Sequence, residues 1–157
     1  MKKIYKKIIN FFKYIIILIV CLSPSNVFAT DFTIANGATQ TTRAVLTAND
    51  TLTVANGGTL DYNGYYSVDA DGITFNANNT TINNAGTIQN NQNYGINISN
   101  STNPSIVNSG TITNDDASKG YPIYASQTSS GSVTNSGTIQ PGSSSSMAMY
   151  VAQTTNF

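Results

Sequence analysis

Hydrophobic and polar residues alternate in short runs along the chain after residue 30. Clear examples are Leu52-Thr53-Val54, Ile73-Thr74-Phe75 and Ile96-Asn97-Ile98. A period of two in runs rich in Ile, Val and Thr is typical of strands that bury one face. The same region has no stripe of apolar residues at helical spacing. The pattern therefore predicts an all-β fold.

One short segment recurs along the chain. The copies read INNAGTIQ at 82–89, IVNSGTIT at 106–113 and VTNSGTIQ at 133–140, with VANGGTLD at 54–61 as a more distant relative. Successive Asn-x-Gly turns lie 28, 24 and 27 residues apart, beginning at Asn56, Asn84, Asn108 and Asn135. Self-similarity at a period of about 20–50 residues indicates a repeat architecture with one structural unit per copy.

The recurring turn predicts a corner between two strands, because Asn and Gly adopt positive φ at little cost. The expected corner residues are Asn84, Gly86, Asn108, Gly110, Asn135 and Gly137. Equal turns stacked at a strand spacing of about 4.8 Å would let the three asparagines form a hydrogen-bonded ladder. The neighbouring apolar residues should form inward columns, with Ile82, Ile106 and Val133 before the corner and Ile88, Ile112 and Ile139 after it.

Two or three short strands per unit fit a coil in which each strand pairs in parallel with its equivalents in the units above and below. Crossovers between parallel strands are nearly always right-handed. We therefore expect a right-handed parallel β-helix, or solenoid, of about four irregular rungs.

The first 29 residues have the layout of a secretory signal peptide. The lysine-rich start MKKIYKKIINFFK precedes the apolar run YIIILIVCL, and SPSNVFA ends at Ala29. This run is shorter than the ~20 apolar residues of a membrane-spanning helix, so a cleaved signal helix is favoured over a membrane anchor.

The expected organisation has three parts. Residues 1–29 form the signal peptide, 30–62 an N-terminal capping or first-rung segment, and 63–157 the β-helix repeats. The final MAMYVAQTTNF aligns with YPIYASQTSSG at 121–131 and stops before another Asn-x-Gly corner. The sequence therefore ends in mid-repeat.

The composition of residues 30–157 narrows the possible partners. Arg43 and Lys119 stand against seven aspartates, a net charge of −5. This balance argues against nucleic acid, whose binding depends on basic patches. Cys21 leaves with the signal, so the exported chain has no thiol. Asn, Thr and Ser make up 55 of its 128 residues, which a repeated, well-paired backbone can accommodate with few apolar side chains.

The lysine-rich signal, the TLTVANGGTL segment at 51–60 and the NSGTI units resemble the N-terminal part of a bacterial autotransporter passenger. The resemblance implies a secreted β-helix that a C-terminal membrane barrel carries to the cell surface or outer membrane, or to the extracellular space. Such passengers commonly serve adhesion. The chain departs from the family because the smallest barrel needs eight strands of about 9–11 residues, which it cannot hold. Membrane association is expected only through that missing barrel, and the implied partners are surface proteins or glycans of host or neighbouring cells.

Catalytic chemistry is sparse, because His and Glu are absent and no GxSxG or SxxK motif occurs. The alternative function is a β-helix enzyme that degrades polysaccharide, with paired carboxylates among Asp69, Asp71, Asp115 and Asp116. These aspartates also suit turns, which is the interpretation we adopt. Asp69-Ala70-Asp71-Gly72 resembles the start of a calcium loop, but Ile73 and the absence of a closing Glu depart from it. We assign no catalytic residue, metal or cofactor.

Tyrosines recur at related positions of the repeats, at Tyr94, Tyr121, Tyr124 and Tyr150, and Tyr62, Tyr65 and Tyr66 cluster nearby. An exposed aromatic column would form a contact strip for sugars or proteins. The competing interpretation is that these rings pack at corners or between loops. A third functional hypothesis, ice binding by regular threonines such as Thr51 and Thr53, is disfavoured because the repeat lengths vary.

Secretion should remove residues 1–29, because Val27 and Ala29 give the pattern required before the cut. Intact-mass analysis of the exported protein should show an N-terminus at Thr30. A mature form that retains residues 14–22 would contradict this.

Overall fold

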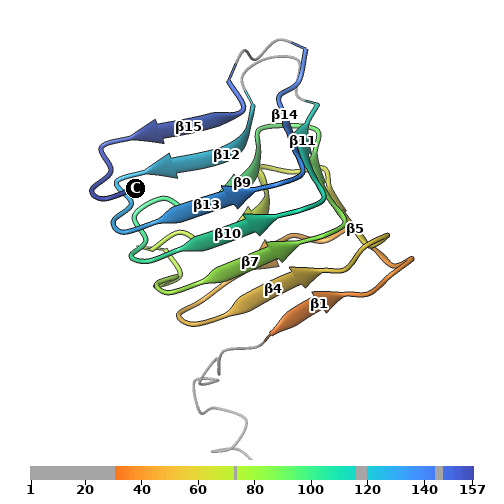
Figure 1. Ribbon diagram of the computed structural model, residues 1–157, viewed down its shortest axis with the longest axis horizontal. Helices are drawn as coiled ribbons and strands as arrows, with labels where there is room; N and C mark the ends of the chain where they lie inside the picture. The colour runs from red at the N-terminus through yellow and green to blue at the C-terminus, as the bar shows by residue number, and fades with distance from the viewer. Residues whose placement is uncertain (1–30, 73, 116–119, 144–146) are drawn as a thin grey trace, which may run out of the picture.

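The computed structural model describes residues 31–72, 74–115, 120–143 and 147–157. In these ranges every regular element is a β-strand, and none is a helix capable of crossing a membrane. Figure 1 shows the strands stacked in layers, with β1 at the bottom and β15 at the top.

The described strands form three parallel sheets of five strands each. Sheet A contains β1 (Phe32–Ile34), β4 (Thr51–Val54), β7 (Thr81–Asn84), β10 (Ser105–Asn108) and β13 (Ser132–Asn135). Sheet B contains β2 (Thr39–Gln40), β5 (Thr59–Tyr62), β8 (Thr87–Asn90), β11 (Thr111–Asn114) and β14 (Thr138–Gln140). Sheet C contains β3 (Ala44–Val45), β6 (Tyr66–Asp69), β9 (Tyr94–Asn97), β12 (Tyr121–Ser126) and β15 (Met149–Ala152).

The chain passes through sheets A, B and C in that order and then repeats the circuit one strand further along each sheet. It completes four circuits between β1 and β13, and β14 and β15 extend the other two sheets. This confirms the predicted parallel β-solenoid of about four turns. β1 to β5 all belong to this coil, so strand stacking begins inside the segment 30–62.

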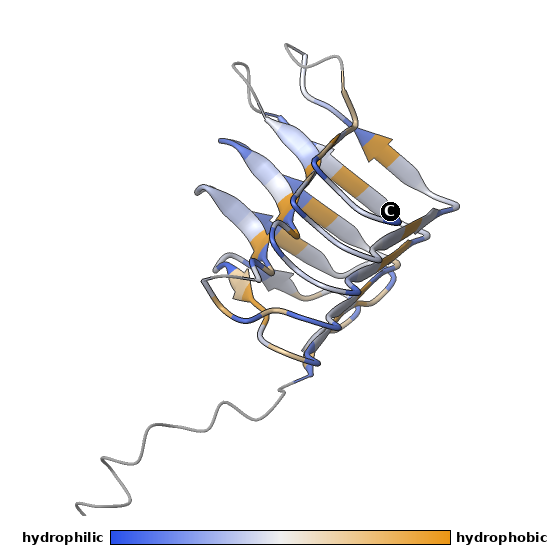
Figure 2. Cartoon of the chain, turned by 90° about the vertical axis from the view of Figure 1, so that its left-hand side faces the viewer, coloured by the Kyte–Doolittle hydropathy of each residue, from blue (hydrophilic) through white to orange (hydrophobic). Residues whose placement is uncertain are grey.

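The interior of the coil is filled by columns of aliphatic side chains. The fully buried members include Leu52, Ile82 and Ile106 of sheet A, Leu60, Ile88 and Ile112 of sheet B, and Val68, Ile96 and Ile123 of sheet C. Figure 2 shows the matching hydrophobic bands repeated from strand to strand. The predicted inward columns are confirmed, although Val133 and Ile139 in the last circuit are only partly buried.

A ladder of asparagines lines the corner between sheets A and B. Asn84 Nδ2 donates to Asn108 Oδ1 over 2.7 Å, and Asn108 Nδ2 donates to Asn135 Oδ1 over 2.7 Å. The same amides also donate to the carbonyl oxygens of Thr111 and Thr138 on the far side of the corner. The predicted ladder is therefore confirmed, and its bonds tie sheet A to sheet B as well as one turn to the next.

The corner has two lengths, which corrects the alignment of Asn56 with Asn84. The strand register places Val54 opposite Asn84 and Thr59 opposite Thr87, so the second circuit has two more corner residues than the third. The sequence alignment was wrong because it matched Asn-Gly-Gly to Asn-Ala-Gly without allowing for this insertion. As a result the ladder ends on an apolar side chain, and Asn84 Oδ1 is buried without a hydrogen-bond partner among the described residues.

The short corner contains Gly86, Gly110 and Gly137 because stacked backbones approach closely there, and not because its glycines have positive φ. Only Gly37 and Gly57, in the longer corners, are described glycines with positive φ. An added Cβ at Gly110 would collide with the carbonyl oxygen of Gly86, and one at Gly137 with that of Gly110. The predicted positive φ at these corners is wrong, and close approach of stacked backbones is the reason for glycine.

Positive φ is instead concentrated at the corner between sheets C and A. One column of this corner contains Asn49, Asn79, Asn103, Ser130 and Asn156, with φ between 52° and 67°. Backbone bonds such as Asn79 N to Thr102 O and Asn103 N to Ser129 O keep successive members in register. Asn79 donates to Asn49 and Asn103 to Asn79 through their side-chain amides, over 3.3 and 3.1 Å. Ser130 interrupts this second asparagine column.

The predicted signal helix at 1–29 lies outside the described residues, as do Ile73, Asp116 and Lys119.

Replacing Gly110 by Ala should lower the free energy of unfolding by on the order of 1–3 kcal/mol, because the added methyl group forces neighbouring backbones apart. The control is Ser109→Ala, since Ser109 is the exposed neighbour in the same turn. Urea unfolding followed by circular dichroism measures both. Equal losses at the two positions would contradict the close-approach explanation.

Replacing Ser130 by Asn should stabilise the protein by about 0.5–1.5 kcal/mol, because the new amide can donate to Asn103 and Asn tolerates the left-handed backbone. Thermal unfolding should show a higher midpoint. Ser132→Asn, on the exposed face of β13, is the matched control and should bring no gain. A lower midpoint for Ser130→Asn would show that this column does not favour asparagine.

Candidate functional site

Strand register brings the recurring tyrosines onto the outer side of sheet C. Tyr66, Tyr94 and Tyr121 occupy one register position on β6, β9 and β12. Tyr124 and Tyr150 occupy a second position on β12 and β15. The four residues predicted as a contact strip therefore lie on neighbouring strands.

The rings of these tyrosines stack on one another. Ring centroids are 5.6 Å apart for Tyr66 and Tyr94, 4.6 Å for Tyr94 and Tyr124, and 5.1 Å for Tyr124 and Tyr150. Tyr121 joins the stack through Tyr94 and Tyr150, at 5.8 and 5.3 Å. Interplanar angles in these pairs lie between 9° and 29°. With Tyr65 these residues form one continuous surface, here termed the tyrosine ribbon.

Stacking determines which parts of each tyrosine ring are exposed on the surface. Because the faces of the stacked rings cover one another, the ribbon presents mainly ring edges and hydroxyl groups. All five stacked tyrosines are partly buried. The rings therefore pack against each other and also form an outer surface, and their use as a contact strip for sugars or proteins stays a prediction.

Tyr65 is oriented differently from the other rings. Its plane makes angles of 83° with Tyr66 and 72° with Tyr94, at centroid distances of 4.6 and 5.8 Å. Tyr66 and Tyr94 are themselves stacked 5.6 Å apart, so a ring close to both must lie beside the stack. At this distance a perpendicular ring packs one face against the edges of its neighbours. Tyr65 is 55% exposed, whereas the five stacked tyrosines are partly buried.

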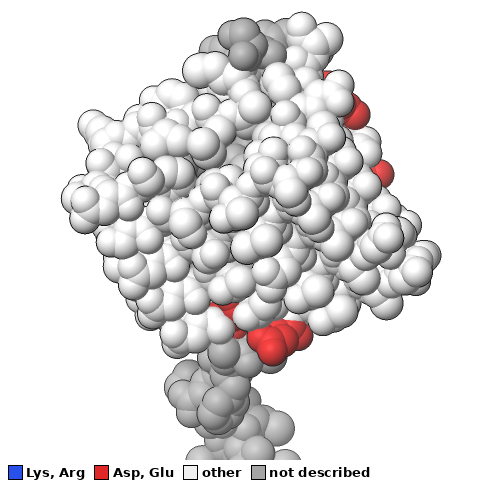
Figure 3. Space-filling model, in the orientation of Figure 1, with Lys and Arg blue, Asp and Glu red and all other residues white. Residues whose placement is uncertain are grey.

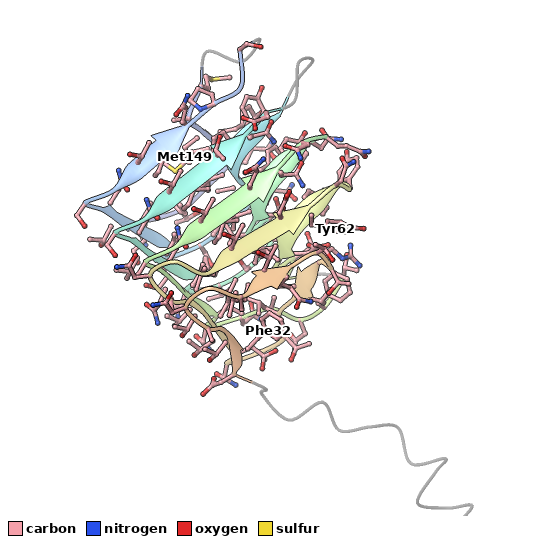
Figure 4. All side chains as sticks on the ribbon, turned by 90° about the vertical axis from the view of Figure 1, so that its right-hand side faces the viewer. Phe32, Tyr62 and Met149 are labelled. Atoms are coloured by element: carbon pink, nitrogen blue, oxygen red, sulfur yellow. The ribbon has the colours of Figure 1, made fainter. Side chains whose placement is uncertain are left out.

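The predicted strip omitted Tyr65 and Tyr66. Aligning the strand sequences YSVD at 66–69 and YGIN at 94–97 would have found Tyr66, because both begin with Tyr and place an aliphatic residue two positions later. No sequence signal gives the perpendicular ring of Tyr65. Tyr62 ends β5 in sheet B (Figure 4) and has no register partner in the ribbon.

Burial raises the pKa of two tyrosines of the ribbon. Desolvation raises the pKa of Tyr66 far above its ordinary value, and Tyr65, Asp69 and Tyr94 raise it further. Desolvation is also the main cause of the raised pKa of Tyr94, followed by the neighbouring tyrosines. Tyr66 and Tyr94 thus keep neutral hydroxyl groups at physiological pH.

Asp69, Asn97 and Arg43 form a polar cluster next to the tyrosine ribbon. Asp69 and Asn97 share the register position of Tyr124 on the two preceding strands. Asn97 Nδ2 donates to Asp69 Oδ1 over 3.0 Å, and Arg43 Nη1 donates to Asp69 Oδ2 over 3.1 Å. Burial raises the pKa of Asp69, while the Asn97 hydrogen bond and the Arg43 charge oppose that rise. Both oxygens of this carboxylate are therefore engaged in holding adjacent strands.

Two further aspartates proposed for the enzyme alternative, Asp71 and Asp115, lie in the described part of the chain and accept local hydrogen bonds. Asp71 accepts from Thr74 N over 2.7 Å and from Asn100 Nδ2 over 2.9 Å, which is a turn role. Asp115 follows β11 and accepts from Gln89 and Thr113. No group of three or more potential metal-binding residues occurs in the described part of the chain. The suggested calcium loop at 69–72 is thus occupied by structural hydrogen bonds.

The outer faces of sheets A and B bear on the ice-binding hypothesis. Varying repeat length does not disturb these faces, because the strands stay in register and the extra residues lie in corners. The argument that varying repeat lengths disfavour a flat threonine array is therefore wrong. On sheet A, however, the outward register position passes from Thr53 through Asn83 and Val107 to Thr134. On sheet B one outward position is threonine in all five strands, at Thr39, Thr59, Thr87, Thr111 and Thr138. The next outward position of sheet B holds Asp61, Gln89, Thr113 and Gln140, so threonine does not repeat at both positions of the described strands. Figure 3 shows the face of sheet A uncharged, with carboxylates at its margins.

Comparisons with protein-family models, with curated proteins and with solved structures each find no match for the chain. No family or homologue therefore identifies the chain as an autotransporter passenger, and the structure shows a parallel β-solenoid of about four turns.

The raised pKa values of Tyr66 and Tyr94 predict a loss of stability at alkaline pH. Free tyrosine ionises near pH 10, so above that pH the unfolded chain releases protons that the folded chain retains, and the free energy of unfolding falls. Urea unfolding between pH 8 and 11 should show this fall, with a smaller one in Tyr66→Phe, which cannot ionise there. A constant midpoint across this range would contradict the prediction.

Proposed function

We propose that the chain is an exported structural and adhesive β-solenoid module of the autotransporter-passenger type, displayed at the cell surface or released outside the cell. Its tyrosine ribbon contacts proteins or glycans on host or neighbouring cells. The solenoid acts as the rigid support that holds the ribbon in place.

The tyrosine ribbon is the observation that carries this proposal. Six partly or largely exposed aromatic side chains gather on one sheet of a chain whose surface is otherwise dominated by Asn, Thr and Ser. Tyrosine is enriched at binding interfaces because it offers a large rigid contact area and a hydroxyl group at small entropic cost. Stacking pre-organises these rings, which lowers the entropy lost on contact.

The placement of the aspartates favours an adhesive module over a polysaccharide-degrading enzyme. Paired carboxylates in glycosidases face each other across the bound sugar. Here Asp69 is paired with Arg43 and Asn97, whereas Asp71 caps a turn. We therefore assign these carboxylates to the fold and propose no catalytic residue.

The proposal is tested by adhesion of beads coated with the exported chain to epithelial monolayers and to bacterial lawns. The ribbon variant carries Tyr124→Ala and Tyr150→Ala, and the control carries Thr59→Ala and Thr87→Ala on sheet B. Circular dichroism confirms that each variant is folded. Loss of two central aromatic contacts should reduce bead retention about tenfold or more, with little change in the control.

Equal retention of wild-type and uncoated beads would overturn the adhesive function. Retention of the ribbon variant at the wild-type level would show that adhesion uses another surface.

A further inference from the structure

Unlike the five stacked rings of the ribbon, which are partly buried, Tyr65 stands beside the stack and is exposed. Its inner face lies against the edges of Tyr66 and Tyr94. The backbone bond from Tyr94 N to Tyr65 O, at 3.1 Å, fixes the two residues on adjacent turns. The ring contacts and this backbone bond thus restrict Tyr65, while 55% of its surface remains exposed.

Uncharged amide residues flank Tyr65 along the chain and occupy the same corner on the next turn. Asn63 precedes Tyr65 in the corner between sheets B and C, and the next turn places residues 91–93, Asn-Gln-Asn, at the same corner. Asn90 Oδ1 accepts from the backbone N–H groups of Gln92 and Asn93, over 2.8 and 2.9 Å, and so shapes this loop. Asn63, Asn91 and Gln92 are exposed. Neither 62–66 nor 90–94 contains a charged residue.

We propose that Tyr65 is the stacking platform of a binding site for a neutral glycan. The C–H groups on one face of a pyranose ring carry partial positive charge and pack against the negative face of an aromatic ring. The amide side chains of Asn63, Asn91 and Gln92 supply donors and acceptors for the sugar hydroxyl groups. This assignment depends on the proposed adhesive function and names its ligand class.

The surroundings favour a neutral sugar over a cationic ligand. A cation above an aromatic ring is usually bound with help from nearby carboxylates that offset its desolvation. The carboxylate that acts most directly on this part of the ribbon is Asp69, and it is already paired with Arg43 at 3.1 Å. Amide groups without charge match sugar hydroxyl groups instead.

The experiment measures binding of soluble neutral oligosaccharides to the exported chain by saturation-transfer-difference NMR and titration calorimetry. The probes end in β-galactose, β-glucose or N-acetylglucosamine. At least one probe should bind, with saturation transfer strongest at the C–H protons of one sugar face. Tyr65→Ala should weaken binding about tenfold or more. Tyr65→Phe should bind within about threefold of wild type because it keeps the ring face.

The control is the sheet B variant that carries Thr59→Ala and Thr87→Ala, because both residues lie outside the tyrosine ribbon. It should retain glycan binding. Absence of binding by all probes, or unchanged binding by Tyr65→Ala, would overturn the glycan site. If beads still adhere under either of those outcomes, the adhesive function stands and the ligand class is wrong.

Discussion

The spacing between hydrogen-bonded parallel strands governs the structure of this protein. Each circuit places its residues about 4.8 Å from the equivalent residues of the circuit below, so every side chain must be compatible with a close neighbour at the same register position. Aliphatic residues stack inside, asparagines form ladders at corners, and tyrosines stack outside. A chain with few apolar residues can fold in this way because amide ladders satisfy buried polar groups while linking one turn to the next.

The same constraint explains which features the sequence could predict. Repeated Asn-x-Gly turns and alternating residues are visible as identity and period, and they gave the solenoid, the inward columns and the Asn84–Asn108–Asn135 ladder correctly. The reason for the corner glycines could not be predicted in the same way. Glycine is selected both for positive φ and for close backbone approach, and only the distances to neighbouring turns show that the second cause operates at Gly110.

The difference in length between the two kinds of corner could also not be predicted from the turn motifs. The two additional residues at Asn56 and Gly57 change neither the strands nor their register, so a comparison of turn motifs alone aligns the wrong residues. For the candidate site, spacing predicted Tyr94, Tyr121, Tyr124 and Tyr150 as one strip. The perpendicular ring of Tyr65 results from packing beside two stacked rings, and no sequence period carries that information.

The claim that stacking between turns holds the coil together is tested most directly by native-state amide hydrogen exchange on residues 30–157. If each turn is stabilised chiefly by its neighbours, protection should be greatest in β7, β8, β10 and β11 and should decrease toward β1 and β15. Strands of the three sheets that belong to the same circuit should show similar protection. Protection that differs between the three sheets but not between successive circuits would contradict this account.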